Sequence, residues 1–233
     1  MIEVISASGV IPSSSDIEKF EKYIDLLLEY NEKFNLTAIT TRDDIILKHF
    51  TDSLFCSKSI KKGLSVADIG SGAGFPGLPL AIVRKDLNIT LMDSLQKRVG
   101  FLNTVINVLS LSNVTAIHAR AEEFGSNLKF RESFDVVTTR AVSNLGIVSE
   151  YSLPFVRLGG CMLAMRGRDP YTEINNGNST LKLIKDLGGD VPQITAYQLP
   201  DSDIAHSIVF IKKLSSTPKT YPRRGKKLGS YKE

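Results

Sequence analysis

The chain has 233 residues, of which 42% are hydrophobic and 23% charged, and its formal net charge is +4. These values are typical of a globular protein with one sizeable α/β core. No apolar run reaches the roughly 18 residues that a membrane-spanning helix needs, and the first residues lack the pattern of a signal peptide. Cys56 and Cys161 are far apart and form no CxxC pattern, which argues against a disulfide framework or a zinc site. We therefore expect a cytoplasmic protein without a membrane span and without a metal.

Apolar residues recur at helical spacing over residues 15–34 and again over about 43–60. We expect residues 1–60 to form a helical extension packed on a core of residues 61–214, in which strand-like and helix-like segments alternate. The predicted strands are 64–69, 88–92, 113–117, 134–138, 160–165, 192–199 and 206–212, and the predicted helices are 76–85, 94–110, 144–157 and 171–187.

This alternation predicts an α/β fold with a mainly parallel seven-stranded sheet that is covered by helices on both faces. The last two predicted strands leave no room for a crossover helix between them. We therefore expect them to pair antiparallel, which the sheet of an ordinary dehydrogenase would not do at its end.

The segment after the first predicted strand, Val66–Gly77, reads VADIGSGAGFPG. A buried strand that runs into a glycine-rich turn and then a helix opens many nucleotide-binding α/β domains. Two ligand patterns fit this loop. The dinucleotide pattern GxGxxG is matched by Gly72, Gly74 and Gly77, and the DxGxGxG loop of S-adenosylmethionine (SAM) methyltransferases is matched by Asp68, Gly70, Gly72 and Gly74.

Two prolines at the start of the predicted helix decide between these two ligand patterns. A pyrophosphate is bound by several free backbone N–H groups at a helix N-terminus, and Pro76 and Pro79 have none to offer. SAM carries no phosphate and loses little from the prolines, and Asp68 suits a cationic ligand better than an anionic one. The loop therefore favours SAM.

Later strand ends support a bound nucleoside. Asp93 ends the second predicted strand, where an acidic residue usually holds the ribose hydroxyls of an adenosine cofactor, although a plain helix cap would also explain it. Ala121 and Glu122 follow the third strand, where the adenine edge would rest. Arg140 follows the fourth, at the carboxyl edge of the sheet where ligands of open α/β sheets bind.

The C-terminal residues 215–233 are predicted to form a basic, flexible tail. Residues 212–233 carry +7, which leaves −3 for the preceding 211 residues. Such a tail suits contact with a phosphate backbone, but a solubilising end would have the same composition.

Six motifs together resemble one family. They are NLTAIT at Asn35–Thr40, KHFTDSL at Lys48–Leu54, DIGSGAGFPGLPLAI at Asp68–Ile82, MDSLQKR at Met92–Arg98, RAEEF at Arg120–Phe124 and TTRAVSNL at Thr138–Leu145. In this order they resemble the RsmG (GidB) family of bacterial small-subunit rRNA guanine-N7 methyltransferases, and the TPKTYPR segment at 217–223 extends the likeness. The resemblance implies a class I SAM-dependent methyltransferase fold, SAM as cofactor, and methylation of N7 of a guanine in the 530 loop of 16S rRNA.

The resemblance also implies site residues. The cofactor positions that it carries over are Gly70, Phe75, Asp93, Ser94, Leu95, Ala121, Glu122 and Arg140, and Asp68, Gly72 and Gly74 join them from the loop pattern. The candidate RNA contacts are Asn35, His49, Lys97, Arg98 and Arg140, with the tail residues Lys219, Arg223, Arg224, Lys226 and Lys227. For Asn35, a simple helix-ending role is an equal alternative.

The expected chemistry needs no general base. Guanine N7 has a free in-plane lone pair at neutral pH, so in-line displacement requires chiefly that N7 lie about 3 Å from the methyl carbon. Arg140 is expected to reach guanine O6, a phosphate or the cofactor, because a donor on N7 would block the nucleophile. Asp52 and Glu122 are candidates to stabilise the cationic product. Three alternatives are a small-molecule methyltransferase, an NAD-type oxidoreductase and an RNA-binding module that uses SAM structurally.

Overall fold

The computed structural model describes residues 1–167, 170–175, 179–203 and 205–223. Within them one seven-stranded sheet has the order β3-β2-β1-β4-β5-β7-β6. The strands are β1 (Ser65–Ile69), β2 (Asn88–Asp93), β3 (Val114–His118), β4 (Phe134–Arg140), β5 (Val156–Arg166), β6 (Gln193–Gln198) and β7 (Ala205–Lys212). The first five strands run parallel, and β7 is antiparallel to both β5 and β6, which confirms the predicted class I methyltransferase topology.

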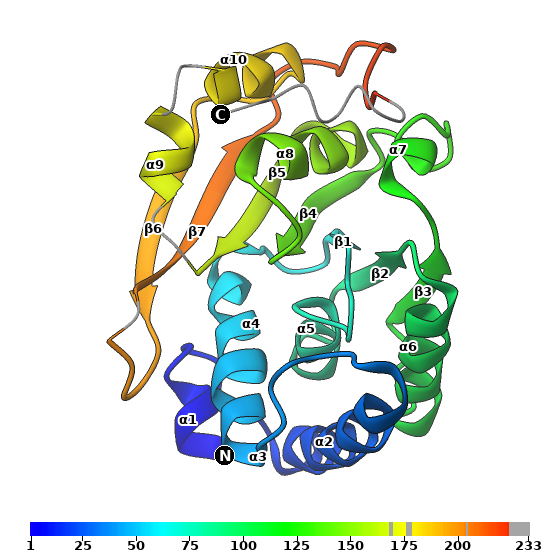
Figure 1. Ribbon diagram of the computed structural model, residues 1–233, viewed down its shortest axis with the longest axis vertical. Helices are drawn as coiled ribbons and strands as arrows, with labels where there is room; N and C mark the ends of the chain where they lie inside the picture. Colours follow the sequence, from blue (N-terminus) through cyan, green and yellow to red (C-terminus); the bar gives the residue numbers. More distant parts are fainter. Residues whose placement is uncertain (168–169, 176–178, 204, 224–233) are drawn as a thin grey trace.

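Both faces of the sheet are buried, because neighbouring residues on a strand point to opposite sides and both sides are apolar. Val66 of β1 and Val136 of β4 pack into one core, and Ala67 and Val137 pack into the other. The first core lies under α2 (Ser14–Phe34), α5 (Gly77–Val83) and α6 (Gln96–Val108). The second lies under α8 (Leu145–Ser152) and α10 (Ser179–Asp186), and Figure 1 shows these two helix layers on either side of the sheet.

The N-terminal helices form part of the first core rather than a separate unit. They are α1 (Ile2–Ser6), α2, α3 (Arg42–Asp44), the π-helix η1 (Ile45–Thr51), α4 (Asp52–Leu54) and the 3-10 helix η2 (Phe55–Ser59). Tyr23 of α2 is fully buried, stacks on Phe75 with 5.7 Å between ring centroids, and donates its hydroxyl hydrogen to the Ala73 carbonyl. The N-terminal segment therefore braces the glycine-rich loop directly.

Some predicted boundaries differ from the structure. The predicted helix 144–157 ends at Ser152, because the 3-10 turn η3 (Leu153–Phe155) contains Pro154 and leads straight into a longer β5. The predicted helix 171–187 is divided between α9 (Pro170–Asn175) and α10. A short helix, α7 (Ala121–Phe124), was not expected.

The first part of the segment predicted to be a flexible tail is ordered on the core. Residues 215–223 lie on the core, where the guanidinium of Arg131 donates hydrogen bonds to the carbonyls of Thr217, Pro218 and Tyr221. Lys213 is 1% exposed and donates to the carbonyls of Leu153 and Leu187 at 2.8 and 2.9 Å. Residues 224–233, including Arg224, Lys226 and Lys227, lie outside the described residues. Among the helices of the described ranges, none combines the length and apolarity that crossing a membrane requires.

Candidate functional site

Three neighbouring cavities open along the carboxyl ends of the parallel strands, with volumes of about 240, 450 and 740 Å³. Val142, just after β4, lines all three. Arg140 and Ala141 line both the second cavity, of 450 Å³, and the third, of 740 Å³. The chain after β4 is therefore the place where ligands in the separate cavities would meet.

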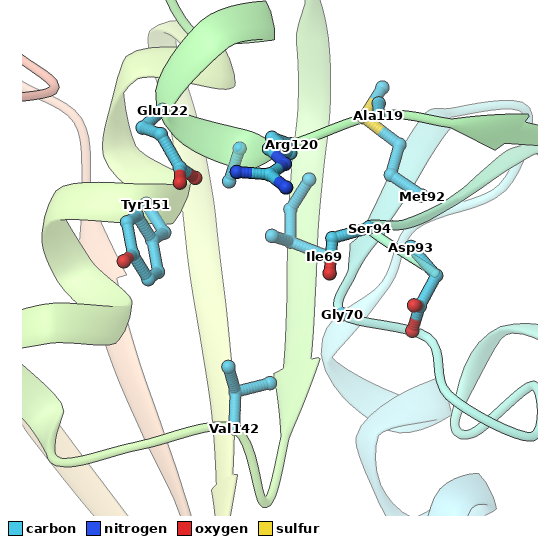
Figure 2. Close-up of a pocket in the computed structure, with 11 residues that line it drawn as sticks. Ile69, Gly70, Met92, Asp93, Ser94, Ala119, Arg120, Glu122, Val142 and Tyr151 are labelled. Carbon is cyan, nitrogen blue, oxygen red and sulfur yellow. The ribbon is translucent and has the colours of Figure 1, made fainter. Parts of the chain in front are cut away.

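The first cavity has flat apolar walls and a few polar groups. Figure 2 shows Glu122 and Tyr151 on one side, with Asp93 and Ser94 across from them and Val142 at a further edge. The apolar part of the wall is formed by Ile69, Met92, Ala119, Ala121 and Val142. Such a slot accepts a flat purine, with hydrogen-bonding groups at its ends.

Asp93 ends β2 at the border between the first and second cavities, and it is 3% exposed. Its two carboxylate oxygens accept hydrogen bonds from the backbone N–H groups of Gly72 and Leu95, both at 2.9 Å. Arg98 lies 3.5 Å from one of these oxygens. A carboxylate has about four acceptor sites, so Asp93 retains lone pairs for a diol such as a ribose.

Nearly all backbone N–H groups of the loop between β1 and α5 already donate hydrogen bonds within the protein. The N–H groups of Gly70, Ser71, Gly72, Gly74, Phe75, Gly77 and Leu78 all donate to acceptors within the protein. Pro76 has no N–H, and among the described residues Ala73 is the one amide of this stretch without an acceptor. The amides that a pyrophosphate would require are thus already committed.

Asp68 lies beneath this loop instead of facing the ligand, which corrects its expected contact with the cofactor. It is fully buried and accepts hydrogen bonds from the Gly77 amide at 3.1 Å and the Thr138 hydroxyl at 3.2 Å. Burial raises the pKa of its carboxyl to about 7, although these hydrogen bonds oppose the rise. Asp68 therefore holds the loop in shape.

The second cavity lies between the glycine-rich loop and the connection after α2. Its floor is an aromatic pair, in which the ring of His49 stacks on Phe75 at 4.2 Å. His49 Nδ1 lies 3.2 Å from an Arg140 nitrogen and Nε2 lies 2.8 Å from the Thr37 hydroxyl. Since Arg140 can only donate, Nδ1 accepts and Nε2 carries the hydrogen. Burial, together with the charge of Arg140, lowers the pKa of His49 to about 3, so the ring is neutral.

Asp52 joins three distant parts of the chain beside the third cavity. It is 2% exposed, and its carboxylate accepts from Arg140 Nε at 2.7 Å, Tyr197 Oη at 2.7 Å and His206 Nδ1 at 3.0 Å. Burial opposes ionisation of Asp52, but the hydrogen bond from His206 and the charge of Arg140 outweigh it and hold its pKa below the usual value. The ionised Asp52 therefore fixes the direction of all three side chains.

The third cavity runs from the loop after β4 to the outer strands. Its polar wall includes an ion pair of Arg166 with Glu173 at 2.5 Å, in which Arg166 also donates to the Ser143 carbonyl. Asn144 lies in this wall and caps α8 by accepting from the Ile147 amide. Tyr197 and His206 close the side formed by β6 and β7.

The structure brings together most of the predicted cofactor residues. The first and second cavities are lined by Gly70, Gly72, Phe75, Asp93, Ser94, Ala121, Glu122 and Arg140. Gly74 and Leu95 do not line them. Gly74 shapes the turn at φ +104°, where an added Cβ would clash with Leu78, and Leu95 donates its amide to Asp93 and leaves its side chain 43% exposed.

Only some of the predicted RNA contacts lie at the cavities. His49 and Arg98 line the second cavity, whereas Lys97 and Lys219 are exposed away from all three. Asn35 ends α2 in the left-handed conformation at φ 49°, which is the helix-ending role. Arg223, a candidate RNA contact, forms an ion pair with Glu150, a fully buried carboxylate of α8.

Sequence reasoning missed several wall residues. Tyr151 lies in none of the six motifs, and Val142 lies in TTRAVSNL but is not among the predicted site residues. Tyr197 and His206 reach the site through the antiparallel strands. Asp52 is predicted only as a candidate to stabilise the cationic product, because its role as the acceptor for three donors depends on the fold.

The chain is similar to known methyltransferases in sequence and in fold. Residues 16–196 match the model of the family described as GidB, rRNA small subunit methyltransferase G. A "Ribosomal RNA small subunit methyltransferase G" from Clostridium beijerinckii is 47% identical over 93% of this chain and 90% of its own length. Among solved structures, a SAM-dependent methyltransferase from Aquifex aeolicus has a TM-score of 0.53 at 14% identity, covering 75% of this chain and 94% of its own. A putative O-methyltransferase from Klebsiella pneumoniae has a TM-score of 0.55 at 14% identity, covering 83% and 90%. These two likenesses bear on the fold alone.

Proposed function

The chain belongs to the rRNA small subunit methyltransferase G (GidB) family, and from this premise we propose that it methylates N7 of a guanine in the 530 loop of 16S rRNA, with SAM as the methyl donor. The proposed partner is 16S rRNA or the small ribosomal subunit, on which the chain acts as a monomer in the cytoplasm. The observation that carries the proposal is the meeting of two cofactor-sized cavities and a larger third one at Arg140–Val142.

The residues present fit SAM. The first cavity offers an apolar slot for adenine, and Asp93 offers acceptor sites for the ribose hydroxyls. Gly70 lies against Val142, and a Cβ at this position would come within 2.8 Å of the valine, so a glycine keeps the passage between the cavities open. Arg140 retains two N–H groups beyond its bonds to Asp52, His49 and the Lys48 carbonyl, and these suit the carboxylate of the methionine part.

Bound SAM supplies an electrophilic methyl group that already carries the activation it needs. The protein therefore has to bind SAM and the target base and to orient them toward each other. Phe75 and His49 form a fixed aromatic floor, and Asp52 holds Arg140 in one direction. His49 is neutral and both its nitrogens are engaged, so it is suited to positioning rather than to proton transfer. No side chain is needed as a general base, because guanine N7 has no proton to lose.

The test incubates the protein with labelled SAM and either small subunits or naked rRNA from a strain that lacks the enzyme. Borohydride reduction and aniline treatment then cleave the RNA at 7-methylguanine. We expect label in 16S rRNA and a single new cleavage within the 530 loop. Binding of SAM without any label in either RNA would overturn the proposal, and label without aniline cleavage would refute N7 as the acceptor.

A further inference from the structure

The third cavity extends across the carboxyl ends of β4 and β5 and the amino end of β7, and its lining runs from Val142 after β4 to His206 of β7. If the chain methylates guanine N7, as proposed above, the target base must leave its stack and bring N7 to the Val142 end, where the cavities meet. This inference rests on the proposed function and adds the residue that reads the base.

The orientation of the base follows from its chemistry. N7 and O6 lie on one edge of guanine, and N1–H and the 2-amino group lie on the adjacent edge, which is farther from N7. With N7 directed toward Val142, this far edge faces the side of the cavity, and His206 of β7 is among the residues that line it. β4 and β7 are two strand spacings apart, about 10 Å, which accommodates a purine with one contact at each edge.

The side chain that meets this far edge is His206. Its Nδ1 is committed to Asp52 at 3.0 Å, and the side chain is 17% exposed on the cavity wall. Within the described part of the chain, Nε2 makes no hydrogen bond. Tyr197, beside it at 5.5 Å between ring centroids, is fixed by its bond to Asp52 and by stacking on Phe55 at 4.2 Å. The imidazole is therefore held in one orientation before any ligand arrives.

We propose that His206 Nε2 accepts a hydrogen bond from N1–H of the extruded guanine and so selects guanine and orients N7 toward the methyl donor. In the tautomer that donates Nδ1–H to Asp52, Nε2 presents a lone pair to the cavity. Arg140 is a second partner of Asp52, so the carboxylate stays paired when Nε2 acts as the acceptor.

The same contact would reject adenine. Adenine has a lone pair at N1 in place of the N–H, so two acceptors would face each other. An unpaired acceptor in a desolvated site is costly, and this is how a polar site excludes a near-isostere.

The experiment compares wild type, His206→Ala and His206→Gln on rRNA fragments that carry guanine or 2-aminopurine at the target position. 2-Aminopurine has N7 but no hydrogen on N1. With guanine, His206→Ala is expected to lower kcat/KM for RNA about 10- to 100-fold, and His206→Gln, whose amide oxygen can accept, to recover part of it. The dissociation constant of SAM is expected to stay within about twofold. Gln193→Ala, an exposed residue of β6, is the matched control.

The decisive result is the coupling between two changes, His206→Ala in the protein and guanine to 2-aminopurine in the RNA. If His206 reads N1–H, the alanine substitution costs little on 2-aminopurine RNA, and the two losses are not additive. Additive losses, or wild-type kcat/KM in His206→Ala, would overturn the assignment. If His206→Ala does not fold, His206→Phe, which keeps a ring but has no acceptor, enters the same cycle. A wild-type protein that makes no 7-methylguanine refutes the proposed function itself, and 7-methylguanine with an additive cycle refutes only the role of His206.

Discussion

Around Asp93, the hydrogen-bond donors come from positions within 21 residues of the carboxylate, whereas Asp52 is bonded to Tyr197, 145 residues further along the chain. Under the proposed function, the first carboxylate organises the cofactor half of the site, at the ends of β1 and β2. The second organises the substrate half, where η1, α4, β4, β6 and β7 converge. The donors to Asp93 come from one short stretch of chain, whereas those to Asp52 are brought together by the tertiary fold.

This difference predicts how each half fails. Damage to the cofactor half should lower SAM affinity while the rest of the molecule stays folded. Damage to the substrate half should loosen three distant segments at once, because they share one acceptor. Four predictions test this contrast.

The largest expected effect is that of Asp52→Ala. Arg140, Tyr197 and His206 lose their shared acceptor, and the mostly buried Arg140 guanidinium loses its counter-charge. Breaking a buried ion pair from one side costs about 3–5 kcal/mol, so we expect a fall of this size in the unfolding free energy from urea titration. Methyl transfer should fall about 100-fold or more, since Arg140 is no longer positioned.

The control for this change is Asp186→Ala, which removes an exposed carboxylate at the end of α10. It is expected to leave stability and methyl transfer near wild type. If Asp52→Ala unfolds within about 1 kcal/mol of the control, Asp52 does not hold the substrate half together, and the contrast between the two halves fails.

The second prediction concerns Asp93→Ala in the cofactor half. We expect SAM affinity, measured by equilibrium dialysis with labelled SAM, to fall about 10- to 100-fold, because the ribose loses its acceptor and two loop amides lose theirs. Affinity for RNA in the absence of SAM is expected to be unchanged. Glu123→Ala is the matched control, since Glu123 is exposed and does not line the first cavity. An equal loss of RNA affinity in Asp93→Ala would contradict the separation of the halves.

The same contrast explains what the sequence could predict. The loop after β1, Asp93 and the pair Ala121–Glu122 follow strand ends that periodicity locates, so the sequence predicts that they meet, and in the structure they line one cavity. The sequence does not contain the pairing of Tyr197 or His206 with Asp52, because it depends on how the antiparallel strands register against β5. Charge alone also misleads. Arg223 belongs to a basic segment but is neutralised by Glu150, and Asp68 belongs to a ligand motif but is buried beneath its own loop.

A smaller effect is expected from Asp68→Asn, which tests whether Asp68 acts on the loop or on the ligand. The carboxyl pKa has its ordinary value of about 3.8 in the unfolded chain and is about 7 in the folded one. Between these values the folded state binds more protons, so the contribution of Asp68 to stability is present below pH 4 and is lost as the pH rises through 7. Asparagine mimics the protonated acid and does not titrate.

Unfolding of both proteins from pH 4 to pH 8 measures this effect. Their free energies should be close at pH 4 and diverge as the pH rises, with the asparagine variant the more stable at pH 7.5. SAM affinity should change little. A curve for wild type parallel to that of the variant would mean that Asp68 is ionised in the folded protein, and a large loss of SAM affinity would return it to the ligand site.

The smallest effect is expected from the basic residues after Arg223, which lie outside the described residues. Arg223 is bound to Glu150, so the basic residues beyond it are the ones left for RNA. Replacing Arg224, Lys226 and Lys227 by Gln should reduce the slope of log affinity against log salt by about 2, because each phosphate contact to single-stranded RNA contributes roughly 0.7. SAM affinity and the unfolding temperature should not move. The control replaces three exposed lysines that precede β1, at the sheet edge opposite the cavities, and so removes the same charge. They are Lys58, Lys61 and Lys62. If both triple variants change the slope equally, net charge rather than the C-terminal segment attracts the RNA, because a long-range field does not distinguish which lysines were lost.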